Sequence, residues 1–207
     1  MRTPRPFALL VAVALLLAAT PARATVLMFM STQELTDHST LVVEGTVLHQ
    51  EVVELDHLYT DTYLLVSGEV HKGAATPGQI IVVRQIGGVT SGLSLLVAGM
   101  ARFKLGEQAL IFAAPAKGPR SEGRLMVMGA ALGKYTLFTD ADGVQRARRD
   151  LSSASVANFG PDGQFKVGEA TSALQKERPA LKSLRAEIAR CVAKKPIKQV
   201  VTEGGAK

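Results

Sequence analysis

The strongest constraint on the fold is a series of short apolar runs that recur roughly every ten residues without a long helical pattern between them. The runs are rich in β-branched or alternating apolar residues, and glycine, proline or polar turns separate them: 41–48, 60–66, 79–85, 93–97, 108–113, 124–128 and 134–138. Gly45 in the first run predicts a bulge or bend, and the D-A-D-G stretch at 140–143 predicts a hairpin turn. These features indicate a mostly β fold, as a sandwich or a small barrel.

Two helices are expected beside the β-rich body. Residues 31–34 read S-T-Q-E, the form of a capping box, and predict a short N-terminal helix. A C-terminal helix is expected over residues 179–195, with Pro179 in its first turn. Its apolar positions recur at intervals of three and four: Leu181, Leu184, Ile188 and either Cys191 or Val192.

The remaining segments lack a clear period. Residues 151–178 are expected to be a linker or loop, in which Asp162 and Gly163 allow one further hairpin turn. Residues 196–207 are expected to be a disordered tail. Residues 25–150 then form the single β domain.

The N-terminal segment has the features of an export signal. Arg2 and Arg5 precede an apolar run over residues 7–19, and A-R-A at 22–24 has the form of a cleavage site. This run is shorter than the roughly 20 residues that a membrane-spanning helix needs. We expect residues 1–24 to be a signal peptide and the mature chain to begin at Thr25. The protein should then be periplasmic or extracellular, without an integral membrane segment after cleavage.

The net charge of +6 is unevenly distributed along the chain. The predicted signal peptide holds three basic and no acidic residues, residues 25–174 carry −3, and residues 175–207 carry +6. A basic tail without interleaved aromatic residues does not favour nucleic acid as a partner. It is compatible with an exported protein or an anionic envelope component as the partner. The helix of this tail is expected to pack its apolar stripe on the β domain rather than to bind a surface.

No catalytic or metal-binding constellation stands out. The four histidines lack the spacing of a metal site, and the lone Cys191 excludes an internal disulfide. The nearest candidate is an apparent loop that holds Glu54, Asp56, His57 and Asp61, which we interpret as a solvated turn. The sequence therefore predicts a protein that is not an enzyme and that has no cofactor. The alternative is a metal-dependent hydrolase that binds its ion through His57 and Asp61.

Order and spacing also suggest a family. The runs from residue 39 to 138, with the segments 84–88 (R-Q-x-G-G), 102–107 (R-F-x-x-G-E) and 133–135 (G-K-Y), resemble the netrin-like barrel of the tissue inhibitors of metalloproteinases. They are also similar to an uncharacterised family of exported bacterial proteins. The resemblance implies a small closed OB-like barrel of five strands and a role in protein binding. The inhibitors place an N-terminal cysteine on the protease zinc, whereas this chain is expected to begin at Thr25, so no inhibitory residue carries over.

We therefore predict an exported, non-catalytic binding or interaction protein, with a protease inhibitor-like module as a further alternative. The predicted binding face is the glycine-rich loop over residues 85–92 and the two arginines near it, because glycine allows close approach and arginine donates to anions or carbonyls. The site residues are Arg84, Gln85, Gly87, Gly88 and Arg102. The alternative interpretation is that the glycines only allow sharp strand connections.

Overall fold

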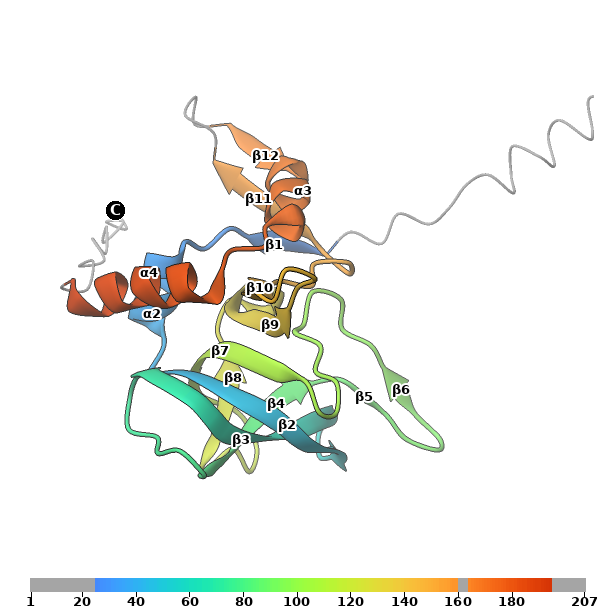
Figure 1. The fold of residues 1–207 in the computed structure, drawn as a ribbon. Coiled ribbons are helices and arrows are strands. Elements are labelled where there is room, and N and C mark those ends of the chain that lie inside the picture. Colours follow the sequence, from blue (N-terminus) through green and yellow to red (C-terminus); the bar gives the residue numbers. More distant parts are fainter. Residues whose placement is uncertain (1–24, 160–163, 195–207) are drawn as a thin grey trace, which may run out of the picture.

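A computed structural model describes residues 25–159 and 164–194 of the chain (Figure 1). The predicted signal peptide and the predicted disordered tail lie outside the described residues. The fold is mostly β, as expected. The long strands are β2 (Leu41–Glu54), β3 (Leu58–Lys72), β4 (Ile80–Ile86), β7 (Gln108–Pro115) and β9 (Lys134–Thr139). The short strands are β1 (Val26–Met28), β5 (Gly88–Val89), β6 (Ser94–Leu95), β8 (Arg124–Val127), β10 (Gln145–Arg148), β11 (Ser155–Phe159) and β12 (Phe165–Val167).

Seven of these strands form one sheet in the order β10-β9-β7-β2-β3-β4-β8. All neighbours in this sheet are antiparallel except β4 and β8, which pair in parallel. Strand β8 also pairs with β7, so its two edges contact two different strands of the same sheet. The register of β2 against β3 shifts next to Gly45 and again after Val47, which agrees with the bulge expected at Gly45.

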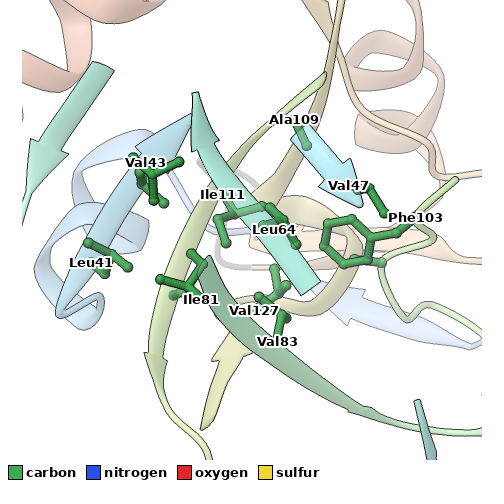
Figure 2. Close-up of a cluster of buried hydrophobic side chains, with 13 residues drawn as sticks. Leu41, Val43, Val47, Leu64, Ile81, Val83, Phe103, Ala109, Ile111 and Val127 are labelled. Carbon is green, nitrogen blue, oxygen red and sulfur yellow. The ribbon is translucent and has the colours of Figure 1, made fainter. Parts of the chain in front are cut away.

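The main hydrophobic core lies on one face of this sheet (Figure 2). Side chains alternate along each strand, so every second residue points into this core. In β4, Ile81 and Val83 point inward beside Leu64 of β3. Ala101 and Phe103 belong to the chain between β6 and β7, and they complete the core from outside the sheet.

Helix α4 (Leu181–Ala193) covers the other face of the sheet, as the apolar stripe predicted. Leu181, Leu184 and Ile188 pack with Val42 of β2 and Phe112 of β7 in a second core. The short helix α2 (Thr32–His38) lies beside α4, and the side chain of its Gln33 donates to the carbonyl of Cys191 over 3.2 Å. The capping box of α2 is present as predicted, with Ser31 and Glu34 bonded reciprocally.

Residues 151–159 and 164–178 contain strands and a helix, where the sequence predicted a linker or loop with one further hairpin. Strand β11 pairs in parallel with β1 and antiparallel with β12, and helix α3 (Glu169–Lys176) follows. Val156 of β11 and Leu174 of α3 pack on Leu132 and Leu151 in a third core. Strands β1 and β11 are short, and they stabilise each other only after the chain has folded. Their local sequences therefore give little indication that they form strands. None of the helices in the described ranges has the length and apolar character that crossing a bilayer requires.

Candidate functional site

A pocket of about 680 Å³ lies beside the predicted glycine-rich loop. Its lining comes mainly from residues 85–88, around the end of β4, and from residues 95–98 and 100–104, which lead from β6 toward β7. Gln50, Thr60, Ser152 and Ser153 complete the lining. We call this the loop pocket. It brings together four of the five predicted site residues: Gln85, Gly87, Gly88 and Arg102.

Gln85 places an amide at the polar end of the main core. It follows Ile81 and Val83 in the alternation of β4, and its register partner on β3 is Thr60. The Gln85 side chain therefore shares the inward face of the sheet, and the residue is only 8% exposed. Its Nε2 group is buried and has no hydrogen-bond partner among the described residues. A buried donor without a partner costs roughly 1–3 kcal/mol, which an acceptor on a ligand would recover.

The two glycines shape the loop pocket through their backbone. Gly87 has a φ of 114°, and a Cβ there would lie 3.0 Å from the carbonyl oxygen of Leu95. A Cβ on Gly88 would lie 2.6 Å from a methyl group of Val52. Gly87 therefore favours glycine for its backbone conformation, and Gly88 favours glycine because a side chain would collide with Val52. The stretch between them and Leu95 is the hairpin of β5 and β6, which projects from the sheet in Figure 1.

Arg102 lies on the rim of the loop pocket. Within 101–104 the chain alternates, so that Ala101 and Phe103 are buried in the core while Arg102 and Lys104 are exposed. The two cations therefore project on the same side of the chain. Sequence analysis identified Arg102 and missed Lys104, although the alternation of polar and apolar residues around Phe103 could have indicated both.

Arg84 is not part of the loop pocket, which corrects the prediction for this residue. It is 4% exposed and donates to both carboxylate oxygens of Asp61 over 2.6 and 2.7 Å. Arg124 donates to the same carboxylate over 2.8 Å, and Arg84 also donates to the carbonyls of Pro119 and Arg120. The guanidinium of Arg84 is thus hydrogen-bonded within the protein and is not free to bind a ligand.

This cluster also removes the support for a metal site at His57. Asp61 is fully buried on β3, whereas His57 is exposed in the turn after β2. Burial would raise the pKa of the Asp61 carboxyl, but hydrogen bonds and charges from Arg84 and Arg124 hold that pKa below its usual value. Asp61 is therefore an ionised partner of two arginines, and it is not available for a hydrolytic metal ion with His57.

A different group of metal-ligand types occurs where α4 meets the sheet. The ligand atoms of Glu44, Glu69 and His71 lie within 4.8 Å of one another. Arg185 of α4 already donates to both oxygens of Glu44, over 2.8 and 2.7 Å. The cation that these carboxylates bind is therefore the guanidinium of Arg185, and the group is a structural cluster that fixes α4.

Comparison with known proteins adds no family. No protein-family model and no curated protein matches this chain. The functional interpretation therefore depends on the residues of the loop pocket. These residues present apolar walls, one unpartnered amide and two exposed cations. These groups can contact an apolar ligand and donate hydrogen bonds to its acceptor or anionic atoms.

Proposed function

We propose that the protein is an exported, non-catalytic binding protein whose ligand occupies the loop pocket. The observation that carries this proposal concerns Gln85, which lines the pocket and whose buried Nε2 group lacks a partner within the described structure. Buried polar groups in folded proteins are nearly always paired. A carbonyl or another acceptor on the ligand would pair with this donor, while Leu95, Val97 and Met100 contact the apolar part.

We also propose that strands β2, β3, β4, β8 and β7 make up a closed OB-like barrel. The pairings support this proposal, because each of these five strands is bonded to two others of the set. The pocket then lies at one end of the barrel, where Gln50, Thr60 and Gln85 replace apolar residues on the inward face. This agrees with the resemblance to netrin-like proteins. Barrels of this type bind many ligands, so the ligand has to be argued from the site.

Binding can be tested with the neutral fluorescent probe N-phenyl-1-naphthylamine and the mature protein from Thr25. We expect saturable one-to-one binding to the wild type and at least tenfold weaker binding to Ala98→Phe, which fills the pocket. Ala141→Phe is the matched control, because Ala141 is exposed in the turn after β9. Equal binding to both variants would overturn the assignment of the pocket.

The role of Gln85 can be tested separately by Gln85→Leu, which has a similar volume and no donor. If Gln85 serves a ligand, this variant should unfold at the same or a higher urea concentration than the wild type, because no internal hydrogen bond is lost. A loss of more than about 1 kcal/mol of stability would show a structural role instead. N-terminal sequencing of protein recovered from the periplasm tests export, and a start far from Thr25 would contradict it.

A further inference from the structure

A second pocket adjoins the loop pocket and is strongly basic. It has a volume of about 560 Å³, and we call it the basic pocket. Six of the side chains that line it are cationic and only two are carboxylates. The loop pocket and the basic pocket share Arg102 and Lys104. Residues 148–150 line the basic pocket and residues 152–153 line the loop pocket, so the two are continuous along the chain as well.

Two of the six cations are neutralised within the protein. Lys134 is buried, and its ammonium group donates to Glu107, to the Thr136 hydroxyl and to the carbonyl of Arg102, each over 2.8 Å. Arg149 is also buried and lies 3.6 Å from the carboxylate of Glu177. These two residues therefore stabilise the fold. Lys134 also neutralises Glu107, which is one of the two carboxylates that line the basic pocket.

The other four cations keep a net positive charge on the pocket: Arg102, Lys104, Arg148 and Arg178. The second carboxylate of the lining, Asp150, accepts hydrogen bonds from the backbone and hydroxyl of Ser152. No ion pair of Asp150 occurs within 4.0 Å in the described ranges. Even when its charge is counted, the exposed part of the lining carries +3. The guanidinium of Arg148 lies over the ring of Phe138, 5.3 Å from its centre, which holds it at the pocket.

We propose that the two pockets together bind one amphiphile, with its anionic head group in the basic pocket and its apolar chain in the loop pocket. This inference rests on the proposed function of the loop pocket and names its class of ligand. Arginine and lysine donors in a group favour phosphate or carboxylate. The loop pocket also offers apolar surface for the chain of such a ligand. Leu96 lines this pocket and is 78% exposed, whereas large apolar side chains are usually buried.

Decyl phosphate, used below its micelle concentration with the mature protein, is a suitable probe. Calorimetry should give one site that binds decyl phosphate more tightly than decanol and much more tightly than inorganic phosphate, since each buried methylene adds roughly fourfold in affinity. Affinity for decyl phosphate should fall as salt rises, while affinity for decanol should not. Equal affinity for decyl phosphate and decanol, or for decyl phosphate and inorganic phosphate, would overturn the proposal.

Arg148→Gln tests the head-group position, because Arg148 lines only the basic pocket. We expect about tenfold weaker binding of decyl phosphate, the loss of one charge-assisted contact, and unchanged binding of decanol. Lys117→Gln removes an exposed lysine outside both pockets and should change neither. An unchanged affinity for decyl phosphate in Arg148→Gln would refute the head-group site. If N-phenyl-1-naphthylamine still bound and Ala98→Phe still blocked it, the proposed function would survive that result.

Discussion

The buried carboxylate of Glu44 allows a quantitative test of how helix α4 is held on the sheet. Glu44 lies on β2 and is 4% exposed. Its carboxylate accepts two hydrogen bonds from Arg185 of α4, and its Oε1 lies 3.0 Å from Nε2 of His71. Burial would raise the pKa of this carboxyl, but the hydrogen bonds and charges of Arg185 and His71 prevail and lower it from 4.5 to about 2.

The size of the effect follows from this shift. Each pKa unit corresponds to roughly 1.4 kcal/mol, so a shift from 4.5 to about 2 corresponds to roughly 3 kcal/mol of stability. The folded-state pKa lies below the unfolded one, so this stability is fully present above pH 4.5 and is lost as the pH falls toward 2. At pH 3 about half of it should remain.

The perturbation is Glu44→Gln, and the measurement is urea unfolding followed by circular dichroism at pH 7 and pH 3. We expect the variant to be less stable by about 3 kcal/mol at pH 7 and by about half as much at pH 3. Glu122→Gln is the control, because Glu122 is exposed and its carboxylate makes no hydrogen bond or ion pair in the described structure. A difference below 1 kcal/mol at pH 7, or one that stays constant between the two pH values, would refute this account.

Three further predictions concern the rest of the molecule. Asp61→Ala leaves Arg84 buried without its partner and should lower the free energy of unfolding by about 3–5 kcal/mol in urea unfolding. The control Asp142→Ala, at an exposed turn, should lower it by less than about 0.5 kcal/mol. Similar losses for both variants would contradict the buried pair. Ser31→Ala removes the cap of α2 and should cost about 1 kcal/mol in the same assay, and no loss would mean that the capping bond contributes nothing. Burial raises the pKa of the Cys191 thiol, so a thiol reagent should modify the folded protein far more slowly than the urea-unfolded one, and equal rates would show that the thiol is accessible.

The long strands could be predicted from the sequence because each carries its own alternation over five or more residues. The strand expected at 79–85 is observed at Ile80–Ile86, and the strand expected at 134–138 is observed at Lys134–Thr139. Strands β1 and β12 have three residues each and no period of their own. The pairing of β1 with β11 joins residues about 130 positions apart, so only tertiary structure makes them strands.

The site was predictable only in part, and the two predicted arginines show why. Arg84 and Arg102 look alike in the sequence, since both lie within a few residues of a glycine. The difference arises from register, because β3 places Asp61 directly opposite Arg84, whereas Arg102 has no such partner strand. Arg148 escaped notice for the same reason, because β10 brings it to the pocket from a distant position in the chain.

The composition of the basic pocket also determines how binding should depend on pH. Three of the four exposed cations that line this pocket are arginines, a residue type that stays protonated in proteins. A hydrogen bond from Ser152 lowers the pKa of Asp150, so its charge is likewise constant near neutrality. The charge of the pocket therefore barely changes between pH 5 and 8, and the ligand must supply any pH dependence. A phosphate head group gains its second charge near pH 6, so its affinity should rise through about that pH. A carboxylate of the same chain length is already ionised there and should show no such rise.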